Sequence, residues 1–167
     1  MQGANNKNHY VGEEAMSKRD ILDIKYPIKN GIVTNWEDME RVWHHTLSNE
    51  LCASPEDVSG VLVTEAPHNP SANREKMVTI LFESFGFHAV AIALQPVMSL
   101  YNSGRSTGLV VDSGEGFTHT VPVYEGSYMP AGINKIEIAG RAINDFCKKL
   151  LLNAGLSFTS SLEKEIL

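Results

Sequence analysis

The sequence has few of the residues that mark disulfide-stabilised or zinc-binding proteins. Only two cysteines occur in 167 residues, and Cys52 and Cys147 lie far apart without forming a Cys-x-x-Cys pair. Cysteine usage therefore argues against a disulfide framework and favours a reduced, cytosolic chain. The six histidines do not cluster at metal-ligand spacing, and the adjacent His44 and His45 would point about 100° apart on a helix.

Positive charge and long apolar runs are also scarce. The net charge is −6, and no basic run is longer than Lys18-Arg19 or Lys148-Lys149. A protein that binds a phosphate backbone is expected to be basic, so a nucleic-acid partner is disfavoured. The polar stretch 1–8 lacks the apolar core of a signal peptide, and no apolar run is long enough for a membrane span. The composition, 43% hydrophobic and 20% charged, is typical of a soluble globular protein.

Apolar residues alternate between helical and strand-like patterns along the chain. Thr34 and Glu37 match a capping box, and apolar residues then recur at three- and four-residue steps to Leu51, which predicts a helix. Compact apolar runs predict strands at 61–65, 88–94 and 107–112, separated by helical patterns at 70–85 and 95–100. A further helical pattern begins at Gly140 and continues through Ile143, Phe146, Leu150 and Leu151. This order predicts an α/β fold with right-handed βαβ units in a parallel sheet. Runs without polar alternation predict strands that are covered on both faces.

A Gly-rich turn follows the third predicted strand. The stretch Asp112-Ser-Gly114-Glu-Gly116 joins this strand to the polar Thr118 and His119 and then to another strand-like run. Small residues let backbone N–H groups close around a phosphate, and Asp112 stands where the hydration shell of a metal ion could be held. Gly-rich hairpin turns are common, however, and such residues more often serve as plain turn chemistry. The turn alone leaves both interpretations open.

A series of short strings extends from about Tyr10 to Phe158 and supplies the missing context. The strings are Tyr10-Val-Gly-Glu-Glu-Ala, Ser17-Lys-Arg, Lys25-Tyr-Pro-Ile, Gly31-Ile-Val-Thr-Asn-Trp36, Trp43-His-His, Asn49-Glu-Leu, Thr64-Glu-Ala-Pro, Ala72-Asn-Arg-Glu-Lys-Met77, Ser99-Leu-Tyr, Ser103-Gly-Arg, Thr118-His-Thr-Val-Pro, Tyr124-Glu-Gly, Ala139-Gly-Arg and Ser157-Phe-Thr. By their number and order, the chain resembles the actin family.

The resemblance implies a partial actin-like ATPase fold of the ribonuclease H-like type, in which ATP lies between two lobes. It also implies that the chain is an internal fragment, which starts after the family's first phosphate loop and ends before the residues around the adenine. Residues 1–26 correspond to part of the small outer subdomain with its mobile contact loop, and 27–102 to part of the first large-lobe subdomain. Residues 103–138 correspond to part of the second-lobe subdomain with the phosphate loop, and 139–167 to the start of the second-lobe outer subdomain.

The resemblance implies catalytic and metal-binding roles for three residues. Gln95 matches the glutamine that orients the attacking water, and His119 matches the histidine near that water. Asp112 matches the carboxylate that holds water around a divalent cation, Mg²⁺ or Ca²⁺. The backbone that wraps the phosphates of ATP is matched by Ser113, Gly114, Glu115, Gly116 and Phe117.

Other matched positions lie outside the phosphate turn. Gly140 matches a position on the ribose side of the nucleotide. The family's cleft for a neighbouring subunit or a regulatory partner is matched by Tyr101, Gly104 and Ser106. The implied partners are therefore other actin subunits and actin-binding proteins, together with a folding chaperone, in the cytoplasm and the cytoskeleton.

Some positions depart from the family's pattern. Glu115 replaces an Asp in the phosphate loop, and Asn30 replaces the family's modified histidine. Ala142 and Ser127 replace an acidic residue and a tyrosine. The contact loop is polar at Gln2, Asn5 and Asn6, which weakens a filament contact made by burying apolar side chains.

Two functions are therefore expected as alternatives. The first is an ATP-binding filament subunit that couples ATP hydrolysis to assembly. The second is a truncated, non-catalytic actin-like protein that binds actin or its partners without ATP turnover, because only part of the nucleotide site is present.

Overall fold

The structure, a computed structural model, describes residues 9–156 of the chain. The predicted contact loop, with Gln2, Asn5 and Asn6, lies outside this range. The elements in chain order are α1 (Glu13–Met16), β1 (Ile28–Lys29), β2 (Ile32–Val33), α2 (Trp36–His45), the π-helix η1 (Thr46–Glu50), β3 (Val61–Glu65), α3 (Ser71–Thr79), the π-helix η2 (Ile80–Ser84), β4 (Val90–Leu94), α4 (Gln95–Asn102), β5 (Gly108–Ser113), β6 (Thr118–Tyr124), β7 (Ser127–Tyr128), the 3₁₀-helix η3 (Pro130–Gly132), β8 (Asn134–Ile136) and α5 (Gly140–Asn153). None of the helices in residues 9–156 has the length and apolar content needed to cross a membrane.

The first predicted βαβ unit is confirmed. β3 and β4 are parallel, with pairs from Val61↔Val90 to Glu65↔Leu94, and α3 with η2 forms the crossover between them. The unit is held together by a core cluster around Leu81, which is 1% exposed. α4 begins directly after β4, as the pattern at 95–100 predicted.

The third predicted strand does not extend the parallel sheet. β5 instead pairs antiparallel with β6, from Gly108↔Val123 to Ser113↔Thr118, and β6 also pairs antiparallel with β7 and β8. The prediction of a single parallel sheet was therefore wrong at this strand. The Gly-rich turn reverses the chain over a few residues, so that the next strand returns directly alongside β5.

The coverage of the strands also differs from the prediction. Half-buried and exposed positions alternate along β3 and β5, and Leu62, Leu109 and Val111 are 58%, 64% and 64% exposed. The expectation that both faces of the strands are covered was wrong for this reason. Within residues 9–156, β3 and β5 are each packed on one face, which is the arrangement expected for a half-buried sheet.

The helix predicted from the capping box is present as α2 and η1, but it begins one residue later than expected. The N-cap is Asn35, whose side-chain oxygen accepts a hydrogen bond from the Asp38 N–H at 3.1 Å. The Thr34 hydroxyl donates instead to the Pro27 carbonyl at 3.1 Å. Thr34 therefore stabilises the entry to the β1–β2 hairpin, and the capping residue is its neighbour.

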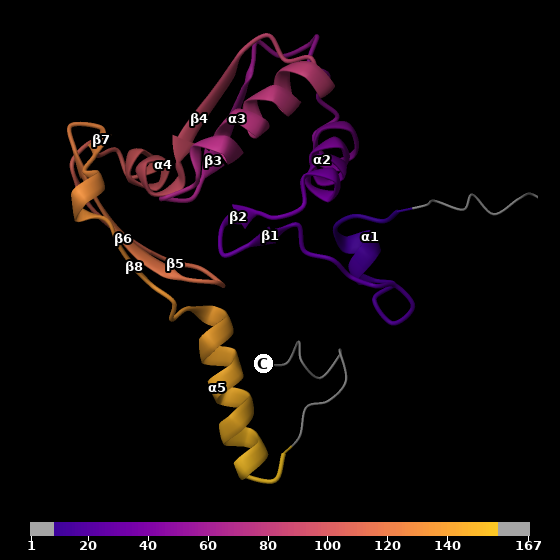
Figure 1. Ribbon diagram of the computed structural model, residues 1–167, viewed down its shortest axis with the longest axis vertical. Helices are drawn as coiled ribbons and strands as arrows, with labels where there is room; N and C mark the ends of the chain where they lie inside the picture. Colours follow the sequence, from indigo (N-terminus) through magenta and orange to yellow (C-terminus); the bar gives the residue numbers. More distant parts are fainter. Residues whose placement is uncertain (1–8, 157–167) are drawn as a thin grey trace, which may run out of the picture.

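The β1–β2 hairpin lies between the β5–β6–β8 sheet and α2 (Figure 1). Figure 1 shows the βαβ unit at the top, the β5–β6–β8 sheet to one side of it, and the β1–β2 hairpin with α2 facing that sheet. A second core cluster, centred on Val121 at 0% exposed, joins α4 to β6. α5 extends from the end of the sheet away from the other elements. The end of β3, the start of α4 and the β5–β6 turn contribute residues to one cavity.

Candidate functional site

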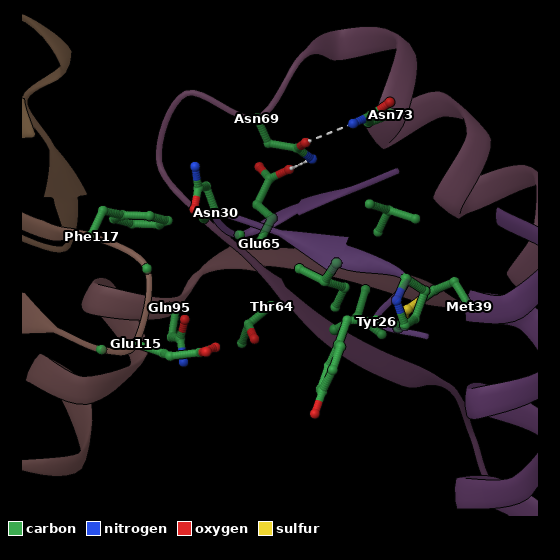
Figure 2. Close-up of a pocket in the computed structure, with 18 of the residues that line it drawn as sticks. Tyr26, Asn30, Met39, Thr64, Glu65, Asn69, Asn73, Gln95, Glu115 and Phe117 are labelled. Atoms are coloured by element: carbon green, nitrogen blue, oxygen red, sulfur yellow. Dashed lines mark hydrogen bonds between the residues drawn. The ribbon is translucent and has the colours of Figure 1, made fainter. Parts of the chain in front are cut away.

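A cavity of about 730 Å³ lies between the β1–β2 hairpin, the end of β3 and the Gly-rich turn (Figure 2). α2 forms an apolar wall on one side, with Trp36, Met39 and Trp43. The polar lining comes from the Gly-rich turn with its flanking strand ends, from the end of β3 with the following loop and α3, from the hairpin tip, and from the first residues of α4 and α5. The polar lining residues are Asn30, Thr64, Glu65, Asn69, Asn73, Gln95, Asp112, Glu115, His119 and Arg141.

The Gly-rich turn presents unpaired backbone donors. The Gly114 N–H closes the turn by donating to the Phe117 carbonyl at 3.4 Å. The N–H groups of Glu115 and Gly116 have no acceptor in the part of the chain that the structure describes. A Cβ at Gly114 would meet nothing within 4 Å, so space remains on that side of the turn. Successive free N–H groups at such a turn form a nest that suits an anion.

His119 lies beside Asp112 across the hairpin and is buried. The two residues are direct cross-strand partners, and the Asp112 Oδ2 atom lies 3.7 Å from His119 Nε2. The imidazole is 4% exposed, yet neither ring nitrogen has a hydrogen-bond partner within residues 9–156. Burial lowers the pKa of His119, with Lys135 and His68 acting in the same direction and Asp112 opposing them. A neutral imidazole with unused donor and acceptor sites thus lines the cavity beside a carboxylate.

Phe117 fixes one side of this imidazole. Its ring centroid lies 5.0 Å from that of His119, and the Lys135 Nζ atom lies 4.5 Å from the Phe117 ring centroid. The Phe117 ring also contacts the tip of the β1–β2 hairpin, where a Cβ at Gly31 would come within 2.9 Å of it. The aromatic ring therefore links the Gly-rich turn to the opposite hairpin.

The β1–β2 hairpin was not predicted, although its sequence carries a hairpin signal. Asn30 and Gly31 form its two-residue loop with φ values of 49° and 76°. Positive φ at both positions is the geometry of a type I′ turn, for which Asn-Gly is strongly preferred. The Asn30 side chain lies against Gly116, where a Cβ would meet its Oδ1 atom at 3.0 Å. The Asn-Gly dipeptide between apolar residues would have identified this wall of the cavity.

A hydrogen-bonded network at the end of β3 was also missed. The buried Glu65 carboxylate accepts hydrogen bonds from Asn69 Nδ2 at 2.9 Å and from the Arg74 guanidinium. Asn69 in turn accepts from Asn73 Nδ2 at 3.3 Å, as Figure 2 shows. The apolar run at 61–65 does not indicate these partners, because they come from the following loop and from α3.

The N-terminus of α5 is attached to the Gly-rich turn. The Gly140 N–H donates to the Gly114 carbonyl at 3.0 Å, and the Arg141 N–H donates to the Glu115 carbonyl at 2.8 Å. The Arg141 guanidinium also pairs with the Glu115 carboxylate at 3.0 Å. These hydrogen bonds satisfy the first free N–H groups of the helix, and they hold the Gly114 and Glu115 carbonyl groups of the turn in place.

The structure brings most of the predicted nucleotide-site residues together. Those that line the cavity are Gln95, Asp112, Gly114, Glu115, Gly116, Phe117 and His119. Ser113 and Gly140 lie beside it: the Ser113 hydroxyl is 2.6 Å from that of Thr118, and Gly140 contacts the turn backbone.

The predicted partner cleft lies elsewhere, at the opposite end of the β5–β6 hairpin. The Tyr101 hydroxyl donates to the Gly126 carbonyl at 3.2 Å, and the Gly126 N–H donates to the Ser106 carbonyl at 2.7 Å. Gly104 forms the turn between them, with φ 74°. These three positions therefore form one local surface that is separate from the cavity.

Comparison with protein-family models gives a match over nearly the whole chain. The model described as Actin matches residues 1–164 of the chain, which includes every residue of the cavity.

Proposed function

The chain belongs to the actin family, and from this premise we propose that it is an actin-like cytoskeletal protein that binds ATP as a filament subunit and couples hydrolysis to assembly. The proposal assigns it part of an actin-like ATPase fold of the ribonuclease H-like type. Residues 27–102 and 103–138 would belong to the two lobes that face the nucleotide. Residues 1–26 and 139–167 would belong to the outer subdomains. Its proposed location is the cytoplasmic cytoskeleton.

One observation carries the proposal: a buried, unpartnered imidazole, a carboxylate and two free backbone N–H groups line one cavity. An ordinary hairpin turn leaves its polar groups in water and needs no such cavity. A buried polar group without a partner calls for an explanation, and a bound ligand or water supplies one. The volume of about 730 Å³ lies within the range of small-molecule sites.

The donor set fits a divalent cation that is held mainly through water. No group of three or more His, Cys, Asp or Glu residues within 9–156 could form an all-protein metal site. Mg²⁺ usually keeps several waters and binds through one or two carboxylates together with substrate phosphates. Asp112, which is half-buried at the cavity wall, is the carboxylate that we assign to this role. When bound with ATP, Mg²⁺ would offset the negative charge of the phosphates.

The remaining residues would bind the phosphates of ATP and orient the attacking water. The free N–H groups of Glu115 and Gly116 would hold phosphate oxygens, and Gln95 and His119 would position the attacking water. The lowered pKa of His119 keeps its ring neutral at pH 7, so that it offers one donor and one acceptor to that water. Positioning and electrostatics supply most of the rate in phosphoryl transfer, so a partial site is expected to act slowly.

Partner binding is assigned to the surface formed by Tyr101, Gly104 and Ser106. Tyr101 is 45% exposed, and its hydroxyl is already held by the Gly126 carbonyl. A fixed, half-exposed aromatic side chain is a common anchor in protein interfaces. We propose that this surface receives a neighbouring actin subunit or an actin-binding protein. A folding chaperone is a further proposed partner.

Single-turnover hydrolysis of ATP by the full 167-residue chain tests the proposal. With Mg²⁺ present, we expect slow release of phosphate that falls at least about tenfold in Gln95→Ala and in His119→Ala. Leu152→Ala, on the far side of α5, is the matched control and should leave the rate unchanged. ATP binding without turnover in the wild-type chain would instead support the second function, a non-catalytic actin-like protein.

A further inference from the structure

The tip of the β1–β2 hairpin carries an Asn-Gly pair. Among the asparagines of the sequence, only Asn30 is followed by a glycine. Because glycine has no Cβ, its backbone nitrogen can come closer to the preceding side chain than that of any other residue. Asn30 is therefore the asparagine whose side-chain carbon is most open to attack by the chain itself.

The two groups that would react are not engaged elsewhere. Asn30 is exposed, and its side-chain amide forms no hydrogen bond with any residue in 9–156. The Gly31 N–H also has no acceptor in that range. Neither the amide carbon nor the attacking nitrogen is thus protected by a hydrogen bond.

The hairpin that holds the pair is short. Its strands have two residues each, with the pairs Ile28↔Val33 and Lys29↔Ile32. A two-stranded hairpin of this kind is marginally stable by itself. Asn30 has φ 49°, in the left-handed region that residues with a Cβ do not favour. Local opening of the hairpin therefore releases the Asn30 backbone and lets the Gly31 nitrogen reach the Asn30 Cγ atom.

We propose that Asn30 is a site of spontaneous deamidation, and that the carboxylate formed there opposes the binding of anions at the Gly-rich turn. The Gly31 nitrogen loses its proton and forms a bond to Asn30 Cγ. The Cγ–Nδ2 bond then breaks, and the side-chain nitrogen takes up a proton and leaves as ammonia. Water opens the resulting cyclic imide at either of its carbonyl groups, which gives aspartate or isoaspartate. The net reaction consumes one water and releases one ammonia.

The new carboxylate would lie beside the proposed phosphate site. Asn30 lines the cavity, as Figure 2 shows, and its Oδ1 atom would lie 3.0 Å from a Cβ at Gly116. Gly116 carries one of the two free N–H groups that we assign to the phosphates of ATP. A negative charge so close to a bound phosphate repels it. This effect on ATP rests on the proposed function, whereas the deamidation does not.

The isoaspartate product would also alter the turn. Its main chain runs through Cβ and Cγ, which adds one carbon atom to the two-residue loop. The type I′ turn depends on this loop length and on positive φ at both residues. The hairpin tip, where Gly31 lies close to Ala66 and Phe117, would then shift. Both products therefore change the cavity wall that faces the Gly-rich turn.

Peptide mass spectrometry of the full 167-residue chain, incubated at neutral and at mildly alkaline pH, tests the deamidation. Asn102 is the internal reference, because it is also exposed but is followed by Ser103, whose Cβ hinders ring closure. Asn30 should be modified at least about tenfold faster than Asn102. The rate should rise with pH, because the attacking nitrogen must lose its proton. Equal rates at the two positions would overturn the proposal, as would a product without isoaspartate, since direct hydrolysis gives aspartate alone.

Titration with ATP and Mg²⁺ tests the effect on the cavity. Asn30→Asp reproduces one product and keeps the turn, because Asp-Gly also suits a type I′ turn. Asn102→Asp is the matched control, since it adds the same charge at a residue that does not line the cavity. Asn30→Asp should weaken binding about tenfold, and Asn102→Asp should leave it unchanged. Thermal melts check that both variants are folded.

The two parts of the proposal can fail separately. Equal ATP affinity in Asn30→Asp and the wild-type chain would overturn the effect on the cavity. A wild-type chain that binds no ATP would overturn the proposed function and this effect together. The mass measurement decides the deamidation of Asn30 in either case, because it involves no nucleotide.

Discussion

The helical segments Ser71–Ser84 and Gly140–Asn153 differ in how far their apolar side chains are enclosed. The segment Ser71–Ser84, formed by α3 and η2, buries Met77, Ile80 and Leu81 against the β3–β4 unit. α5, Gly140–Asn153, buries none of its residues. The same apolar spacing predicted both helices. The comparison shows that hydrophobic periodicity predicts a helix and the side of it that is apolar. Whether that side is buried depends on which other elements the fold packs against it.

The largest expected difference between the two helices is in the free energy of unfolding that each loses when one of its leucines is replaced by alanine. Leu81→Ala should lower the free energy of unfolding by about 2–5 kcal/mol, because Leu81 is 1% exposed and its loss leaves a cavity. Leu152→Ala should change it by less than about 0.5 kcal/mol, because this side chain is already largely in water. Urea titration followed by circular dichroism measures both values. Equal losses would contradict the assignment of the enclosed and exposed helices.

Two glycine substitutions separate the cost of a steric contact from the cost of a left-handed backbone conformation. Gly31 and Gly86 both have φ 76°, but a Cβ at Gly31 would lie 2.8 Å from the Ala66 Cβ, whereas one at Gly86 would meet nothing within 4 Å. Gly86→Ala should cost about 1–2 kcal/mol from the backbone alone. Gly31→Ala should cost roughly 1–3 kcal/mol more, because the hairpin tip must move away from Ala66 and from the Phe117 ring beside the Gly-rich turn. Equal costs in thermal or urea unfolding would show that the two turns do not touch.

The pH dependence of stability tests the enclosure of His119. Its folded-state pKa is lowered by burial, so the unfolded chain binds more protons below about pH 6.5. The contribution of His119 to stability is therefore fully present above that pH and is lost as the pH falls toward the lowered pKa. Unfolding free energies at several pH values should show a slope that His119→Gln reduces by up to about 1.4 kcal/mol per pH unit. An unchanged slope in the variant would place the imidazole in water.

The smallest effect is expected where α5 meets the Gly-rich turn. Arg141 and Glu115 pair at 3.0 Å, but their side chains are 55% and 75% exposed. Exposed pairs of this kind contribute little, so Arg141→Ala should change the unfolding free energy by at most about 0.5 kcal/mol. A double-mutant cycle with Glu115→Gln measures the coupling. A coupling of several kcal/mol would mean that the Arg141–Glu115 pair is buried from solvent, which would contradict its exposure in the structure.

The sequence predicted the elements of the fold well where they depend on local pattern. The strands at 61–65 and 88–94, the crossover helix between them and the helix from Gly140 are all present. The pairing of β5 was mispredicted, because an apolar run looks the same in a parallel and an antiparallel sheet. Its true partner is chosen by the short turn at Gly114–Gly116, which returns the chain alongside β5.

Only part of the cavity lining was predicted, again because the sequence shows local patterns but not long-range pairing. Asp112 and His119 are close in sequence and face each other across one hairpin, so a local motif contained both. Asn30, Glu65 and Asn69 reach the cavity from separate segments, and only the three-dimensional arrangement brings them together. Residues that act through long-range packing leave no local signal in a single sequence.

Binding of ATP with Mg²⁺ to the purified 167-residue chain, measured by calorimetry beside Asp112→Ala, tests the central claim most directly. The account predicts binding with a Kd of about 1–100 μM that depends on Mg²⁺ and is lost in the variant. Circular dichroism confirms that both proteins are folded. A well-folded chain that binds no ATP, or one that binds equally well without the Asp112 carboxylate, would contradict the assignment of this cavity as a nucleotide site.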